Sequence, residues 1–185
     1  MQNNVETYFW QNDKVRLRTP LPMDSENHYL FSVDILGVAF VGEEMPLPPV
    51  KPMIKNDAEP QPPNPSTPAF IIETLSGEYV GGTHFNFINE RHGTFSIGMV
   101  ILKEHRGNGY GKAAMSILLE YAFNERRLHK FEGYCLDDNI ASSKMMESLG
   151  CTLEGTSREC VFMNGKYHNR LLYSLLENEY KQRTK

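Results

Sequence analysis

The chain has 185 residues, a length typical of one compact domain, and 40% of them are hydrophobic, which is enough to build a core. Its 19 Lys and Arg residues against 23 Asp and Glu residues give a net charge of -4, which argues against a nucleic-acid-binding protein. The sequence shows no signal-peptide pattern and no apolar run of membrane-spanning length, so we expect a cytoplasmic protein that does not bind membranes.

The first predicted elements are a strand and a helix. Alternating apolar and charged residues over 15–19 predict the strand, which ends at two prolines. Asp24 or Ser25 can cap the helix, which we expect over 27–40 because its apolar residues recur at nearly helical spacing.

Residues 43–68 differ in composition from the rest of the chain, because they hold nine of its 11 prolines. Proline is excluded from helix interiors and from central strands, so we predict a loop or an inserted flap. It is either a mobile surface connection or a lid over a substrate site.

The remainder of the chain alternates strands and helices. A hairpin is predicted over 69–74 and 78–88, with its turn at Ser76-Gly77. After it the pattern predicts a strand over 94–102, a helix over 109–125, a strand over 130–136, a helix over 139–149 stopped by Gly150, and two strands over 151–163 and 166–175 joined by Asn164-Gly165. The order predicts a mixed α+β fold.

Three cysteines, Cys135, Cys151 and Cys160, are odd in number and widely spaced. This pattern fits neither a disulfide framework nor a metal-binding motif, so we expect no metal. We interpret all three as reduced thiols that fill small spaces in the core.

A glycine-rich turn, residues 106–112, follows an apolar strand and precedes an apolar helix. The free backbone amides at a helix N-terminus attract anions, and glycines let phosphate oxygens approach closely. A Walker A motif would need Gly at Arg106 and Ser or Thr at Ala113, and a dinucleotide-binding loop would need Gly at Lys112. These two nucleotide motifs are therefore disfavoured, and a turn that binds no ligand remains the alternative.

Three segments resemble a known family. Arg106-Gly107-Asn108-Gly109-Tyr110-Gly111 is similar to the Arg/Gln-x-x-Gly-x-Gly/Ala signature of the GNAT superfamily of acyl-CoA N-acyltransferases. Residues 139–151 resemble the Asn-x-x-Ser…Glu-x-Leu-Gly-Phe helix of the branch that contains the RimJ and RimL ribosomal-protein acetyltransferases, with Cys151 in place of Phe. Residues 153–159 and 164–169 resemble the terminal hairpin of that branch, with Asn169 in place of a frequent Asp. The resemblance covers about residues 94–179.

The resemblance implies a single N-acetyltransferase domain over 1–185, whose mostly antiparallel sheet is splayed between its fourth and fifth strands and flanked by helices. Acetyl-CoA would lie in the splay and transfer its acetyl group directly to a primary amine, either a protein N-terminus or a small molecule. The net acidity of the chain favours a cationic acceptor. The implied cofactor-binding residues are Met99, Val100, Ile101, Arg106, Gly107, Asn108, Gly109, Tyr110, Gly111, Lys112, Asn139 and Ser142.

The implied catalytic residues are fewer. Many superfamily members carry a Tyr where this chain has Met146, so we assign Ser142 to the leaving sulfur. Asn139 holds the pantetheine arm, caps a helix, or does both. An ammonium must lose a proton before it attacks, and the candidate bases are Glu104 and His84, followed by Glu73; a water chain or an ordinary solvated side chain is the alternative.

Two further possibilities follow from the same pattern. The missing Tyr allows a non-catalytic module that senses acyl-CoA, as an alternative to an enzyme. A homodimer is also possible, with the apolar strand over 171–176 contributing to it, although burial in its own sheet is the stronger expectation.

Overall fold

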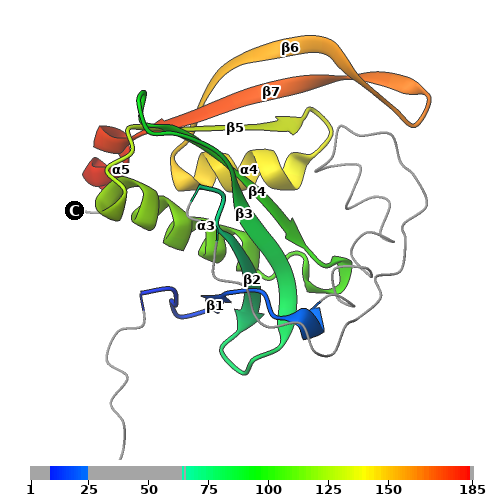
Figure 1. The fold of residues 1–185 in the computed structure, drawn as a ribbon. Helices are drawn as coiled ribbons and strands as arrows, with labels where there is room; N and C mark the ends of the chain where they lie inside the picture. Colours follow the sequence, from blue (N-terminus) through cyan, green and yellow to red (C-terminus); the bar gives the residue numbers. More distant parts are fainter. Residues whose placement is uncertain (1–8, 25–63, 65, 184–185) are drawn as a thin grey trace, which may run out of the picture.

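The structure, a computed structural model, describes residues 9–24, 64 and 66–183 (Figure 1). The predicted helix over 27–40 lies outside the described residues, as does nearly all of the proline-rich stretch over 43–68. No helix in the described part is long and apolar enough to cross a membrane.

One mixed sheet organises the described residues, with the strand order β1-β2-β3-β4-β5-β7-β6. Every neighbouring pair is antiparallel except β4 and β5, which confirms the predicted mixed and mostly antiparallel fold. The strands are β1 (Val15–Arg18), β2 (Ala69–Thr74), β3 (Tyr79–Asn89), β4 (Thr94–Ile101), β5 (Lys130–Leu136), β6 (Thr152–Met163) and β7 (Lys166–Leu176).

The sheet opens between β4 and β5. Only two residue pairs join these strands, Thr94 with Lys130 and Phe95 with Phe131. Figure 1 shows β4 and β5 turning away from each other toward their C-terminal ends. The predicted splay is therefore confirmed, and it leaves one edge of β4 without a strand partner beyond Phe95 among the described residues.

Aromatic side chains build the core beside the two joined pairs. Phe85, Phe95, Phe123 and Phe131 are each at most 1% exposed. The ring of Phe95 lies 5.9 Å from Phe85, 5.4 Å from Phe123 and 5.7 Å from Phe131, measured between centroids. Such tilted and edge-on contacts stabilise a core beyond simple area burial, so the two strands are fixed at this end.

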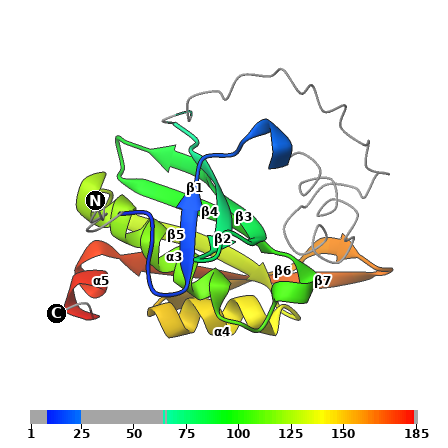
Figure 2. The ribbon, with the colours of Figure 1, turned by 90° about the horizontal axis from the view of Figure 1, so that it is seen from below.

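Two helices lie side by side against the sheet (Figure 2): α3 (Tyr110–Glu120) and α4 (Ile140–Leu149). A π-helical turn, Tyr121–Glu125, continues α3, so the predicted helix over 109–125 is confirmed with a change of winding. Gly150 ends α4 in the left-handed region at φ 95°, as predicted. The short helix α5 (Glu177–Arg183) was not predicted, because its seven residues carry no apolar periodicity.

The two predicted hairpins are also confirmed. Asn164 and Gly165 adopt φ values of 52° and 80°, as a two-residue turn requires, and the tip of the β6–β7 hairpin projects beyond the other strands in both views (Figures 1 and 2). Since β7 lies between β5 and β6, its backbone is paired on both sides. The stronger expectation, that the strand over 171–176 is held within its own sheet, is therefore confirmed, and a homodimer stays a prediction.

The prediction that all three cysteines fill core space is wrong for Cys160. All three thiols are free, and Cys135 and Cys151 are buried, but Cys160 is exposed on β6. Burial raises the pKa of the Cys151 thiol to about 12, which makes it unreactive at neutral pH. Cys135 and Cys151 therefore fill core space as predicted, whereas Cys160 lies on the edge strand β6 with its side chain in water.

A charged network ties β1 to β2 at the other edge of the sheet. The buried Glu73 carboxylate accepts hydrogen bonds from Arg16 Nε and Arg18 Nε, each at 2.7 Å. Arg18 also donates two bonds of 2.8 Å to Asp24, whose carboxylate accepts from Leu21 N as well. Burial acts to raise the pKa of Glu73, but the bonds from Arg18 and Arg16 outweigh it, and the pKa lies below its ordinary value.

We predict that Glu73→Gln lowers the free energy of unfolding by about 2 kcal/mol, because it removes the buried carboxylate shared by Arg16 and Arg18, of which only Arg18 keeps another, that of Asp24. A carboxyl with a lowered folded-state pKa stabilises the protein fully above its ordinary value of 4.5 and loses this effect as the pH falls through the lowered pKa. Urea unfolding at about pH 7 and about pH 3 measures the effect. The difference between wild type and variant should shrink at the lower pH, and a difference that grows there would contradict the assignment.

Candidate functional site

The glycine-rich loop joins the end of β4 to the start of α3. A short 3-10 helix, Lys103–His105, leads into it. Gly107 and Gly109 adopt φ values of 82° and 80°, in the left-handed region that L side chains rarely occupy. Both positions therefore require glycine for the loop to turn into the helix.

The first amides of α3 have no acceptor within the described backbone. Gly109 is the N-cap and offers no side chain, and the first bond of the helix runs from Ala113 N to Gly109 O at 3.0 Å. The amides of Tyr110, Gly111 and Lys112 precede this bond. A Cβ atom built on Gly107 would meet nothing within 4 Å, so the approach to the loop is open. Such a helix N-terminus binds anions through its amides and its dipole.

Three cations surround this loop. Arg106 and Lys112, two of the residues implied to bind the cofactor, are exposed, and Arg106 Nε donates to Ile101 O at 3.0 Å. The third, Lys14, was missed, because it is 94 residues away in sequence from Asn108, whose carbonyl accepts a bond of 3.4 Å from Lys14 Nζ. Positive charge from two distant segments thus meets at the helix start.

The last residues of β4 present an unpaired edge. Met99, Val100 and Ile101 pair with Thr83, Gly82 and Gly81 of β3 on one side only. On the other side the described residues supply no strand, because β5 has separated from β4. Backbone groups that face this open side have no strand partner, although Ile101 O accepts from Arg106 Nε. The contact of these three residues with a cofactor, which the resemblance implies, stays a prediction.

Gly111 packs the two helices and β4 together. A Cβ atom built on it would lie 3.4 Å from Met145 Sδ and 3.5 Å from both Ile101 Cγ1 and Met99 Sδ. Its missing side chain therefore brings α3 close to β4 and α4, which is a packing role beside the predicted binding role. Met145 was missed, since a methionine at helical spacing gives no signal of a site.

The start of α4 lies next to the end of β5. Asn139 Oδ1 accepts from Ser142 N at 3.1 Å, so the capping role is confirmed, while its contact with a cofactor stays a prediction. Burial raises the pKa of the Cys135 thiol, and a hydrogen bond with the Ser142 side chain partly offsets this. Met146, the position where the family resemblance implies a Tyr, is 3% exposed and belongs to the core.

A buried phenol was missed on the neighbouring strand. Tyr173 Oη lies 2.7 Å from Ser143 Oγ and donates to Glu147 Oε1 at 3.1 Å. The Ser143 bond acts to lower the pKa of Tyr173, but burial and the Glu147 carboxylate outweigh it and raise the pKa. Tyr173 therefore stays a neutral hydrogen-bonding group that holds α4 against β7.

The three predicted bases occupy different surroundings. His84 is exposed on β3, and its ring lies over Gly98 of β4, where a Cβ atom would come within 2.7 Å of it. Glu104 is exposed in the loop. Glu73 is engaged by two arginines at the β1–β2 edge, so it is not free to accept a proton.

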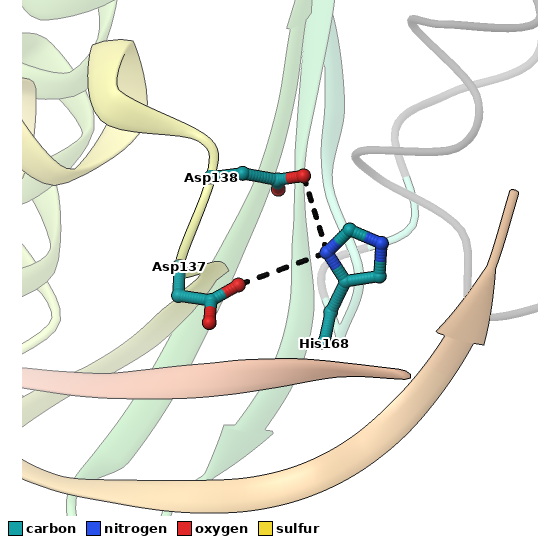
Figure 3. A group of neighbouring side chains, drawn as sticks. All are labelled: Asp137, Asp138 and His168. Atoms are coloured by element: carbon teal, nitrogen blue, oxygen red, sulfur yellow. Dashed lines mark ion pairs between the residues drawn. The ribbon is translucent and has the colours of Figure 1, made fainter. Parts of the chain in front are cut away.

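A cluster at the end of β5 could hold a cation. Asp137, Asp138 and His168 come from two segments, and one ligand atom from each lies within 4.8 Å of the others (Figure 3). The sequence analysis expected no metal and missed this group, because His168 is about 30 residues from the two aspartates. The same arrangement also suits proton transfer, since a carboxylate beside one imidazole nitrogen orients the other.

The comparisons with known proteins agree with this geometry. A family model described as Acetyltransferase (GNAT) domain matches residues 10–152. Two Bacillus subtilis (strain 168) proteins are similar over part of the chain: the uncharacterized N-acetyltransferase YnaD is 31% identical over 87 residues, and the putative ribosomal N-acetyltransferase YdaF is 36% identical over 84 residues. The matches cover 47% and 45% of this chain and 51% and 46% of the relatives, so the chain spans about half the length of these curated relatives.

A solved structure shows the same fold. It is the crystal structure of spermidine N-acetyltransferase from Vibrio cholerae in complex with CoA and spermine, and it superimposes with a TM-score of 0.77 at 20% identity. The superposition covers 92% of this chain and 99% of that one.

We predict that Gly107→Ala weakens binding of acetyl-CoA about tenfold, because a Cβ atom and a shifted backbone would stand where an anion approaches. The matched control is Gly77→Ala, since Gly77 has a similar φ of 88° and equally open surroundings but lies in the β2–β3 turn. Both variants should lose about 1 kcal/mol of stability in thermal unfolding. Equal affinities of the two variants in calorimetric titration would contradict the placement of the anion site.

Proposed function

The chain belongs to the acetyltransferase (GNAT) domain family, and from that premise we propose that it transfers an acetyl group from acetyl-CoA directly to a primary amine. The observation that carries this proposal is the glycine loop at the start of α3, whose free amides and surrounding cations suit a pyrophosphate. Residues 1–185 would form a single domain around this site, with the stretch over 43–68 as part of it.

The cofactor would lie along the opened sheet. Its pyrophosphate would contact the loop residues Arg106, Gly107, Asn108, Gly109, Tyr110, Gly111 and Lys112. Its pantetheine arm would then follow the unpaired edge of β4 at Met99, Val100 and Ile101, with Asn139 on the opposite side. Backbone amides on this edge would stabilise the negative charge that develops on the thioester oxygen in the transition state.

Ser142 is the proposed partner of the leaving sulfur. The buried Met146 supplies no hydroxyl where the family resemblance implies one, whereas the Ser142 side chain lies at the start of α4 beside the end of β5. A hydroxyl there would donate to the departing thiolate. Glu104 and His84 stay predictions as the proton acceptor, and both side chains are exposed.

The proposed acceptor is a primary amine, and two kinds of primary amine have support. The motifs over 139–169 resemble the RimJ and RimL branch, and one relative is named a putative ribosomal N-acetyltransferase, which supports a protein N-terminus. The structural neighbour is named a spermidine N-acetyltransferase, which supports a polyamine. Both acceptors are primary amines that are cationic in water, so a panel containing both is the right test.

The expected outcome is release of free CoA thiol from acetyl-CoA in the presence of spermidine or of a peptide with a free N-terminus. We predict that Ser142→Ala lowers kcat about 10-fold to 100-fold and leaves KM for acetyl-CoA unchanged, because its hydroxyl acts only as the sulfur leaves. The assay is made in a Cys160→Ser background, since the exposed Cys160 thiol would react with the thiol reagent.

Ser148→Ala is the matched control, because Ser148 is an exposed serine of the same helix and bonds only to Met145 O at 2.8 Å in the described structure. Unchanged turnover of Ser142→Ala would remove Ser142 from the mechanism. Binding of acetyl-CoA without thiol release from any amine would instead favour a sensor of acyl-CoA, the alternative that the missing Tyr at Met146 suggests.

A further inference from the structure

His168 is a buried imidazole that the predicted site does not use. It lies near the start of β7, opposite Val161 of β6, and its side chain is 2% exposed. Its Nδ1 atom is 3.1 Å from Asp138 Oδ2 and 3.7 Å from Asp137 Oδ1, so one side of the ring faces two carboxylates (Figure 3).

The other side of the ring is unsatisfied. His168 Nε2 is buried and has no hydrogen-bond partner in the described structure. A buried polar atom without a partner costs free energy, so it is uncommon unless a ligand, a water or a reaction uses it. With Nδ1 beside a carboxylate, the ring is oriented so that Nε2 presents its lone pair.

One of the two carboxylates beside His168, that of Asp137, is itself held in place by hydrogen bonds. Asp137 N donates to Asn169 O at 3.0 Å, and Asn169 Nδ2 donates to Asp137 Oδ2 at 2.8 Å. These bonds lock the end of β5 to the start of β7. The charged groups that face the imidazole among the described residues are the two aspartates, and Lys166 Nζ lies 3.9 Å from Asp138 Oδ2 behind them.

The pair stands next to the proposed cofactor site. Asp137 and Asp138 form the link between β5 and Asn139, the cap of α4. β5 is the strand that separates from β4, and Ser142 approaches it at Cys135. The cluster of Asp137, Asp138 and His168 therefore lies at the β5 side of the opened sheet, next to the start of α4.

We propose that His168 Nε2 is the base that takes a proton from the acceptor ammonium, with Asp138 as its positioning residue. This rests on the proposed acetyl transfer. The ammonium gives one proton to Nε2, and the neutral amine then forms the N–C bond while the C–S bond breaks. The thiolate receives the second amine proton and leaves as the CoA thiol. The imidazolium passes its proton to water beside Asp137 and Asp138, whose side chains are 35% and 41% exposed.

The other candidates lack one or more of these features. His84 and Glu104 are exposed, and no described carboxylate orients the ring of His84. Glu73 is bound by two arginines. His168 alone among the four is buried, oriented and unpartnered at one nitrogen.

The test compares kcat/KM of wild type, His168→Gln, Asp138→Asn and His84→Gln, with His92→Gln as a control at an exposed turn. The probes are spermidine and a peptide with an N-terminal alanine. His168→Gln should lower the rate about 100-fold at about pH 7, and Asp138→Asn about 10-fold. Affinity for acetyl-CoA and the thermal midpoint should not change. The defect of His168→Gln should shrink at about pH 9.5, because more of the amine is then already neutral.

A merely structural role predicts a defect that is the same at both pH values, and this result would overturn the proposal. A full rate in His168→Gln, or a loss of rate confined to His84→Gln, would also overturn the role of His168. Neither result would contradict the proposed acetyl transfer by the wild type. If the wild type releases no thiol with either amine, both the proposed acetyl transfer and the role of His168 as base are overturned. A wild-type rate that is abolished by EDTA and restored by Mn²⁺ would show that the cluster holds a metal ion, which would also overturn the base.

Discussion

The short contact between β4 and β5 is the constraint on which the rest of this structure depends. Two residue pairs join the strands, and the ring of Phe95, packed against Phe123 and Phe131, fixes them at that end. Because the strands then diverge, the last residues of β4 keep a free backbone edge. Gly111 closes the helix side of the same region by admitting Met99, Ile101 and Met145 within van der Waals distance. The sheet is therefore open between β4 and β5 beyond Phe95, while β4, α3 and α4 pack closely together at Gly111.

Charges of opposite sign follow the ends of β4 and β5, the two strands that separate, although the net charge of the chain is only -4. Lys14, Arg106 and Lys112 surround the loop at the start of α3, where a pyrophosphate would bind. Asp137 and Asp138 lie at the end of β5, where a cationic amine would arrive and lose a proton. Anion and cation would thus enter from surroundings of opposite sign, an arrangement that lowers the cost of desolvating both.

Much of the fold was predictable because its signals are local. Alternating residues marked β1, Asn164-Gly165 marked the β6–β7 turn, and Gly150 marked the end of α4. The turn at residues 106–112 between β4 and α3 was also predicted, because its glycines are a local signal. What escaped prediction depends on contacts between distant segments: the cation at Lys14, the packing of Met145 on Gly111, and the meeting of His168 with two aspartates. The exposure of Cys160 escaped for the same reason, since an apolar neighbourhood in sequence does not say which strand lies at an edge.

The central claim is that the loop between β4 and α3 holds the pyrophosphate of acetyl-CoA. The most direct measurement is a crystal structure of the protein bound to CoA. We predict pyrophosphate oxygens at about 3 Å from the amides at the start of α3, next to Gly107 and Gly109, with the pantetheine arm against the free edge of β4. A pyrophosphate bound away from this loop, or a pantetheine arm that does not enter between β4 and β5, would contradict it.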